Sequence, residues 1–182
     1  MDNGASSYRR FLDGDESAFD EIMNELFDNL VFFINGHVND FYAAEDIAIN
    51  TFSDLIVHRG RYNFKVKLKT YLFMIGRCRA LNYIKHRRTH AETELSEELS
   101  VEDESSIFEA VLKDERRRRI YSALEVLPSD MRTAVYLVYF EDMTYDDAAK
   151  VMKKNKKQVD NLLYRAKKEL TVILGKDGEH LI

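Results

Sequence analysis

The chain has 182 residues, 45% of them apolar, and a formal net charge of −5 that arises from 27 basic and 32 acidic side chains. This length and apolar content suffice for one ordinary domain or two small ones. A single cysteine, Cys78, excludes an internal disulfide and fits a reducing cytosol. The N-terminal segment MDNGASSYRR lacks the apolar core of a signal peptide, and no apolar run is as long as a membrane span, so we expect a cytoplasmic protein without membrane insertion.

The charges are separated along the chain. Residues 1–58 hold twelve acids and two bases, residues 59–90 ten bases and no acid, residues 91–115 ten acids and one base, and residues 150–168 eight bases and one acid. Solvated helix faces usually alternate in sign, so an acid-free stretch of this length favours a functional basic surface. We therefore expect two nucleic-acid contact regions, separated by an acidic segment, on a chain that is not basic overall.

The spacing of apolar residues indicates an almost all-helical protein. Apolar side chains recur at intervals of three and four rather than two, and Pro128 is the only proline. We expect an all-α fold of two small helical domains. The helices are predicted over 17–38, 40–58, 67–88, from about 107 to 127, over 129–140, and over two further segments near the C-terminus.

The helix predicted over 67–88 combines cations with aromatic residues. Cations follow the phosphates of single-stranded or melted nucleic acid, and aromatic faces stack on exposed bases at roughly 1–3 kcal/mol per base. The alternative is that the aromatics belong to the core, and for Tyr71 and Phe73 the sequence leaves both interpretations open. The aromatics in and before this helix are Tyr62, Phe64, Tyr71 and Phe73, and its basic side carries Lys67, Lys69, Arg77, Lys85, Arg87 and Arg88.

The acidic, serine-rich segment that begins at Thr89 has too few large apolar residues to fold by itself. We interpret it as a flexible linker between two helical domains. The predicted boundaries are residues 1–90 for the first domain, 91–112 for the linker and 113–182 for the second domain.

The stretch from Thr144 to Leu170 predicts a helix-turn-helix. Thr144 is a good N-cap for a short helix over about 145–152, and Asn155 caps a longer helix over about 156–174. The second helix has an apolar stripe on one side. Its other side carries Lys157, Asn161, Tyr164, Arg165 and Lys168. A short helix, a turn and a basic helix form the unit whose second helix enters the DNA major groove.

No pattern in the chain predicts catalysis. The five histidines lie at no metal-ligand spacing, and the lone cysteine has no partner. A phosphate-binding glycine-rich loop and a nucleophile elbow are both absent from the sequence. We therefore expect a protein that is not an enzyme and that needs no cofactor or metal.

Taken together, these segments resemble bacterial RNA polymerase sigma factors of the extracytoplasmic-function (ECF) type. The resemblance covers about residues 18–88 and 120–174. AEDIAINTF, near residues 43–52, is similar to region 2.2 of that family, and KTYLFMIGRCRALNYIKHRR is similar to regions 2.3 and 2.4. LPSDMRTAVYLVYFEDMTYDDAAKVM, followed by VDNLLYRAKKEL, is similar to region 4.

This resemblance implies partners and site residues. The partners are core RNA polymerase, through its β′ clamp helices and β flap, promoter DNA and an anti-sigma factor. The residues implied for polymerase binding are Asp46, Asn50, Phe52 and Leu55. Those implied for the −10 element are Lys67, Lys69, Tyr71, Arg77, Cys78, Asn82, Lys85, Arg87 and Arg88. Those implied for the −35 element are Lys156, Lys157, Asp160, Asn161, Tyr164, Arg165 and Lys168.

Five positions depart from the pattern of the family. Tyr71, Cys78 and Asn82 stand where the family usually has Trp, Asn and Asp, close to the loop that sets −10 specificity. Lys153 replaces the usual glycine of the helix-turn-helix turn, which predicts either a strained residue or a different turn. Asp160 replaces a common basic residue, and its carboxylate either accepts a hydrogen bond from a cytosine amino group or repels phosphate.

We expect a sigma factor that brings core polymerase to promoters by reading −35 and −10 elements and that helps to melt DNA. Two alternatives remain open at this point. A stand-alone helix-turn-helix regulator that binds DNA as a dimer would account for Thr144–Leu170 but not for the acid-free block at 59–90. A sigma-like adaptor would bind polymerase without reading a promoter.

Overall fold

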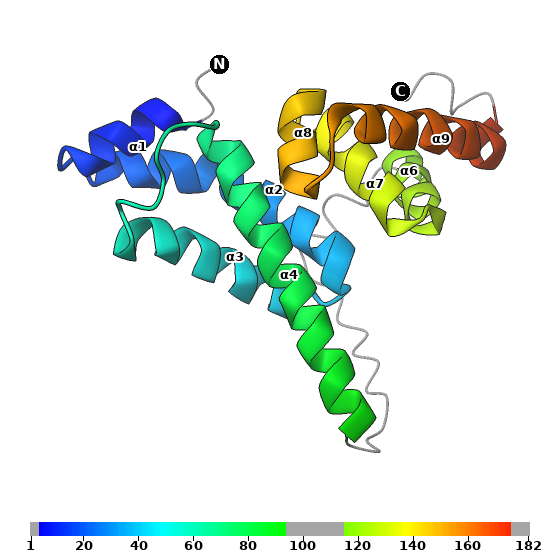
Figure 1. The fold of residues 1–182 in the computed structure, drawn as a ribbon, viewed down its shortest axis with the longest axis horizontal. Coiled ribbons are helices and arrows are strands. Elements are labelled where there is room, and N and C mark those ends of the chain that lie inside the picture. Colours follow the sequence, from blue (N-terminus) through cyan, green and yellow to red (C-terminus); the bar gives the residue numbers. More distant parts are fainter. Residues whose placement is uncertain (1–3, 94–114, 176–182) are drawn as a thin grey trace. The chain divides into compact units, whose positions relative to one another are not determined.

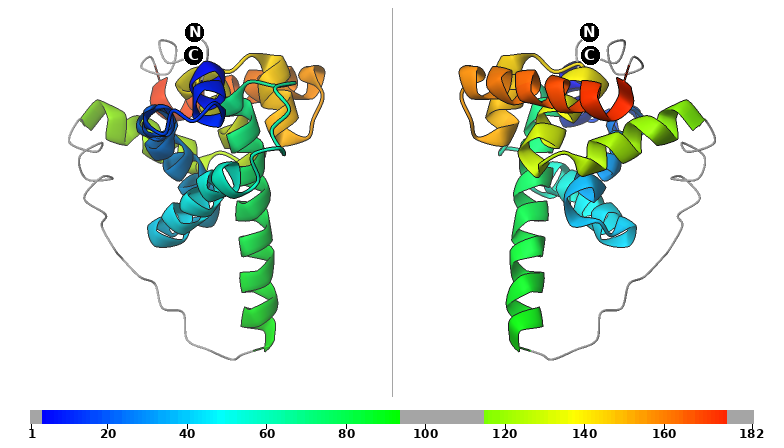
Figure 2. Two further views of the ribbon diagram at one scale, coloured as in Figure 1. Left: turned by 90° about the vertical axis from the view of Figure 1, so that its left-hand side faces the viewer. Right: turned by 90° about the vertical axis from the view of Figure 1, so that its right-hand side faces the viewer.

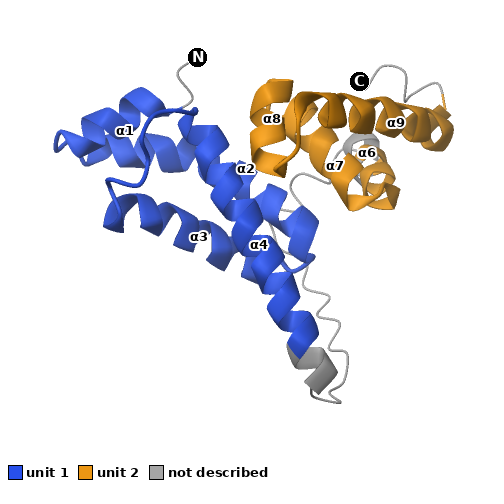
Figure 3. Ribbon diagram, in the orientation of Figure 1, with its two compact units in different colours: residues 1–93 blue, residues 94–182 orange. Residues whose placement is uncertain are grey.

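The computed structural model describes residues 4–93 and 115–175, which divide between two compact units, Met1–Thr93 (unit 1) and Glu94–Ile182 (unit 2) (Figure 3). The described residues are helical with short connections and contain no strand, so the all-α prediction is confirmed. None of their helices is both long and apolar enough to cross a membrane. Most of the predicted linker, residues 94–112, lies outside the described residues.

Unit 1 consists of α1 (Ala5–Leu12), α2 (Ser17–Val38), α3 (Phe41–Val57) and α4 (Leu68–Thr93). Unit 2 contains α6 (Glu115–Val126), α7 (Ser129–Val135), the π-helical turn η1 (Tyr136–Phe140), α8 (Tyr145–Met152) and α9 (Lys156–Leu174) (Figure 1).

A tight corner joins α2 to α3 at the position that the sequence predicts. Asn39 ends α2 in the left-handed conformation, with φ 51° and ψ 45°. Asp40 then caps α3, because its Oδ1 accepts a hydrogen bond from the backbone N–H of Ala43 at 3.0 Å. The corner turns the chain back on itself, and α3 packs along α2.

The helix α4 packs closely against α2 and α3 over its first half only. A Cβ atom added to Gly76 would lie 2.9 Å from Cδ1 of Leu30, so only glycine permits this approach without movement of the α2 side chain. Leu72, Phe73 and Ala80 are buried on the same side. The second half of the helix projects past α2 and α3 (Figures 1 and 2).

The structure decides between the two interpretations for Phe73 but not for Tyr71. Phe73 is fully buried, 4.9 Å from the ring of Phe33 on α2, and Tyr62 is buried as well. Both belong to the core rather than to a nucleic-acid surface. Tyr71 and Phe64 remain partly exposed.

Two features of unit 1 were not predicted. α4 continues to Thr93 instead of ending at Arg88, because the residues that follow Arg88 include no glycine or proline to stop it. α1 gave no periodic signal, since it has eight residues of which only Tyr8 and Phe11 are large and buried.

Unit 2 buries the side chains that the apolar pattern predicts. Met131, Leu137, Val151 and Leu163 are all buried, and they come from α7, η1, α8 and α9 respectively. The predicted helix over 129–140 changes to π geometry in its last part, where the N–H of Glu141 donates to the carbonyl of Tyr136 at 3.1 Å.

Candidate nucleic-acid interfaces

Both predicted N-caps of the helix-turn-helix are present. Oγ1 of Thr144 accepts a hydrogen bond from the N–H of Asp147 at 3.1 Å, which starts α8. Oδ1 of Asn155 accepts from the N–H of Gln158 at 2.8 Å, and Oε1 of Gln158 accepts from the N–H of Asn155 at 2.9 Å. This reciprocal capping box determines where α9 begins and therefore which of its residues face the solvent.

The turn between α8 and α9 keeps a left-handed residue although no glycine is available. Lys153 has φ 54° and ψ 44°, and the N–H of Lys154 donates to the carbonyl of Ala149 at 2.9 Å. This bond closes α8 in the manner of a glycine-ended helix. Lys153 therefore carries the backbone strain that the sequence raised as one of two possibilities.

The second helix of the motif has one buried side and one exposed side. Val159, Leu163, Ala166 and Leu170 are buried against the rest of unit 2. The side chains predicted to read the −35 element all lie on the exposed side of α9. They are Lys156, Lys157, Asp160, Asn161, Tyr164, Arg165 and Lys168.

Some of these exposed side chains have intramolecular partners that a ligand can replace. Nζ of Lys156 lies 3.2 Å from Oδ2 of Asp146, and both residues are largely exposed, so the pair contributes little to stability. Nζ of Lys168 lies 4.6 Å from the centre of the Tyr164 ring. Such contacts hold the cations near the helix and leave them available to phosphate.

In unit 1 the projecting half of α4 presents the last part of the acid-free block. Asn82, Lys85, Arg87 and Arg88 are exposed there, and Cys78 is exposed on the first half of the helix. Lys67, just before the helix, is exposed too, whereas Lys69, Tyr71 and Arg77 are partly buried. The predicted −10 residues therefore do not form one uniform surface.

Two side chains of α4 hold the helix on α3 and were missed by the sequence reasoning. Nη2 of Arg79 forms a hydrogen-bonded ion pair with Oδ2 of Asp54. The hydroxyl of Tyr83 donates to Oδ2 of Asp40 at 3.3 Å, and burial raises the pKa of Tyr83 above its ordinary value. Arg79, one of the cations of the acid-free block, therefore stabilises the packing of α4 on α3.

The connection between α3 and α4, residues 58–67 (the α3–α4 loop), carries an aromatic cluster. The ring of Tyr62 lies 4.6 Å from that of Phe64 and 5.0 Å from that of Tyr71. The hydroxyl of Tyr62 donates to the carbonyl of Val66 at 2.7 Å. Tyr71 is partly buried at the edge of the core, and this burial raises the pKa of its phenol.

The helix α3 requires a correction to the predicted polymerase-binding set. Asp46 and Asn50 are exposed, but Phe52 and Leu55 are each only 2% exposed. The ring of Phe52 packs 5.8 Å from that of Phe27 on α2, so it supports the helix from inside and is not available to a partner.

The exposed side of α3 instead carries apolar residues that the sequence reasoning overlooked. They are Tyr42, Ile49, Ile56 and Val57. The first three are spaced seven residues apart, which places them along one side of the helix, and this spacing is the signal that could have found them.

No group of three or more metal-ligating side chains occurs in the part of the chain that the structure describes. Cys78 is exposed and forms no disulfide.

Comparison with known proteins identifies relatives for both units. Residues 117–170, which include the helix-turn-helix, match the family model described as Sigma-70, region 4. The chain is 26% identical over 166 residues to the RNA polymerase sigma-H factor of Pseudomonas aeruginosa, with 86% of each chain covered. It is 24% identical over 163 residues to the ECF RNA polymerase sigma factor SigM of Bacillus subtilis, covering 86% of this chain and 95% of that protein.

Two solved structures share the fold. One is the sigma factor RpoE from Bartonella quintana, crystallised with the anti-sigma factor NepR, with a TM-score of 0.66, 18% identity, and coverage of 87% of this chain and 98% of that one. The other is CnrH in complex with the cytosolic domain of CnrY, with a TM-score of 0.62, 19% identity and 94% of each chain covered.

The geometry of Lys153 predicts that replacing it with glycine stabilises unit 2. Relief of the left-handed strain, less the greater freedom of glycine in the unfolded chain, should raise the free energy of unfolding by about 0.5–1 kcal/mol. Chemical denaturation followed by circular dichroism measures this difference. Lys153→Ala is the matched control, because alanine removes the same charge but keeps the Cβ atom. Equal stability of the two variants would contradict the assignment of strain.

Proposed function

This chain belongs to the RNA polymerase sigma factors of the ECF type, and we propose that it binds core RNA polymerase, directs it to promoters by reading −35 and −10 elements, and helps to melt the DNA for initiation. The observation that carries the proposal is that each unit presents a helix whose exposed side is mainly basic. These helices are α4 in unit 1 and α9 in unit 2.

The exposed side of α3 is the proposed contact with the β′ clamp helices of polymerase. Asp46 and Asn50 remain in the proposed set, and Tyr42, Ile49 and Ile56 join it in place of the buried residues. An apolar stripe with polar side chains between its members fits the surface of a partner helix. We assign residues 1–90 to this contact and to the −10 element.

The projecting half of α4 is proposed to hold the duplex at the −10 element. Lys85, Arg87 and Arg88 meet phosphates, which fixes position but not sequence. Phe64 and Tyr71, in and after the α3–α4 loop, stabilise a base taken out of the stack. Extrusion of a base costs a few kcal/mol. Contacts with polymerase must supply part of this, so we expect the free protein to bind DNA weakly.

In unit 2 the exposed side of α9 is proposed to enter the major groove of the −35 element. Lys156 and Lys157, at the N-terminus of the helix, meet phosphate. Asp160, Asn161 and Arg165 reach base edges or position the helix, and Tyr164 and Lys168 complete the surface. We assign residues 113–182 to this readout and to the β flap.

The same proposal also concerns the linker, the cellular location and a regulatory partner of the protein. Residues 91–112 tether the two units, and the protein acts in the cytoplasm at the nucleoid. The related RpoE is crystallised with an anti-sigma factor, which supports an anti-sigma partner for this chain as well. We propose no catalytic step for the chain itself, because nucleotide chemistry belongs to polymerase.

A stand-alone dimeric regulator remains the alternative, but it accounts for unit 2 alone. The alignments with sigma factors extend over 86% of the chain and therefore include unit 1.

Run-off transcription with purified core polymerase and a randomised promoter library tests the proposal. We expect promoter-dependent transcripts only when the chain and core are both present, and co-elution of the chain with core. Absence of both would show that the sigma-factor proposal is wrong. A palindromic footprint made by the chain alone would favour the dimeric regulator.

Replacing Arg165 with alanine should weaken binding to promoters that have a strong −35 element. Loss of a base-edge or phosphate contact in the major groove corresponds to about 1–3 kcal/mol in holoenzyme affinity. Fluorescence anisotropy of labelled promoter DNA measures it. Arg132→Ala on α7 removes the same charge from unit 2 and should change affinity far less. Unchanged affinity for Arg165→Ala would contradict the assigned recognition face.

A further inference from the structure

The α3–α4 loop is held by α1, the helix that the sequence did not predict. Tyr8 on α1 is fully buried, and its hydroxyl lies 2.9 Å from the carbonyl oxygen of Leu55 and 3.3 Å from that of Arg59. Its ring lies 5.5 Å from that of Tyr62. One buried side chain thus contacts the last turn of α3, the start of the loop and its centre.

Two cation–aromatic contacts join α1 to the α3–α4 loop, and each of the two segments supplies the cation of one contact and the ring of the other. The guanidinium carbon of Arg9 lies 4.8 Å from the centre of the Phe64 ring, so α1 supplies the cation. The guanidinium carbon of Arg59 lies 4.7 Å from the centre of the Phe11 ring, so here the loop supplies it. Each contact favours the same relative placement of α1 and loop.

Phe64 has a backbone conformation that bulky residues rarely adopt. Its φ is 61°, in the left-handed region. A strained conformation of this kind persists only where the surroundings determine it, and it often marks a functional site. The surroundings of Phe64 are Arg9, the ring of Tyr8 at 6.1 Å and the ring of Tyr62 at 4.6 Å. Two of these three side chains come from α1.

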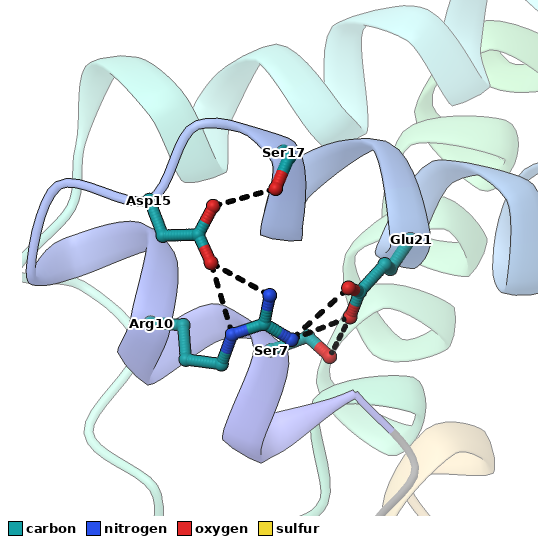
Figure 4. A network of polar contacts seen from close by, with 5 residues as sticks. All are labelled: Ser7, Arg10, Asp15, Ser17 and Glu21. Carbon is teal, nitrogen blue, oxygen red and sulfur yellow. Dashed lines mark hydrogen bonds and ion pairs between the residues drawn. The ribbon is translucent and has the colours of Figure 1, made fainter.

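The helix α1 is itself fixed to α2 by a polar network (Figure 4). Arg10 donates to Oδ2 of Asp15 at 2.6 Å and to Oε2 of Glu21 at 2.9 Å. Ser7 donates to the same Glu21 oxygen at 2.9 Å, and Ser17 donates to Oδ1 of Asp15 at 2.6 Å. Hydrogen bonds from Ser17 and Arg10 lower the pKa of Asp15.

The N-terminal end of α1 packs against Leu68, the first residue of α4. Gly4 precedes α1 with φ 83°, and a Cβ atom added there would lie 3.1 Å from Cδ2 of Leu68. Since Tyr8 contacts the end of α3, the short helix α1 bridges the two ends of the α3–α4 loop.

We propose that α1 is a positioning element for capture of the −10 base. Tyr8 and Arg9 are its positioning residues, and they hold the loop with Phe64 ready to stack on an unstacked base of single-stranded promoter DNA. This inference rests on the proposed function, because that function assigns base capture to the loop.

The test uses holoenzyme reconstituted from the full chain and core polymerase. The probes are single-stranded oligonucleotides spanning the −10 element of a promoter selected by the wild-type protein, with each of the four bases placed in turn at every position. The measured quantity is the ratio of affinities for the best and the worst base at the captured position. The variants are Arg9→Ala, Arg9→Lys and Tyr8→Phe, with Arg132→Ala as a charge-matched control in unit 2.

For Arg9→Ala and Tyr8→Phe we expect this ratio to fall by roughly three- to tenfold, as expected for the loss of one cation–aromatic contact or one hydrogen bond. Arg9→Lys should keep the ratio within about twofold of wild type, because a cation remains over the ring. The thermal midpoint of unit 1 should not change in Arg9→Ala, because Arg9 is exposed, whereas Tyr8→Phe should lower it by a few degrees through the lost buried hydrogen bond. The affinity for core and for a −35 duplex should not change in either variant.

An unchanged ratio in both variants would overturn the inference. So would an equal loss of affinity for all probes, because that pattern indicates a general phosphate contact or a destabilised domain. If the wild-type holoenzyme shows no base preference on these probes, the proposed function itself fails and the inference falls with it.

Discussion

The close approach of α4 to α2 at Gly76 determines what unit 1 can present to a partner. A Cβ atom added to Gly76 would lie 2.9 Å from Cδ1 of Leu30, so any larger residue at this position would displace the side chains of α2. Phe73 and its buried neighbours fill the inner side of α4. Arg79 pairs with Asp54 of α3, and Lys85, Arg87 and Arg88 lie exposed on the second half of the helix. The basic surface is thus a result of packing, not of net charge.

The same physical logic applies to unit 2 at a smaller scale. The capping box at Asn155 fixes the first turn of α9, and burial of Val159 and Leu163 fixes its rotation. The polar residues of α9 therefore lie on the side of the helix that faces the solvent. Neither basic helix offers a large surface alone. Holding both on one polymerase would make the second contact intramolecular, so that two modest sites select one promoter.

How far the sequence could predict this structure depends on whether a signal is local. Thr144 and Asn155 were identified correctly because a cap and the helix it starts are neighbours in the chain. The role of Tyr8 was not visible, since its hydroxyl contacts the carbonyl of Leu55, 47 residues away. Leu55 shows a different limit, because the family resemblance suggested a contact surface whereas its side chain is buried in the core. For Phe73 the choice between core and nucleic-acid surface depended on its contact with Phe33 of α2, which only the structure shows.

The central claim is that two units read two DNA elements while polymerase holds them in one register. The most direct test is transcription by the reconstituted holoenzyme from a selected promoter with an altered spacer. The spacer between the −35 and −10 elements is lengthened by about five base pairs, which is half a helical turn. The account predicts a loss of at least about tenfold, since the −35 element then faces away from α9 while α4 stays on the −10 element. Equal transcription from both spacers would contradict it.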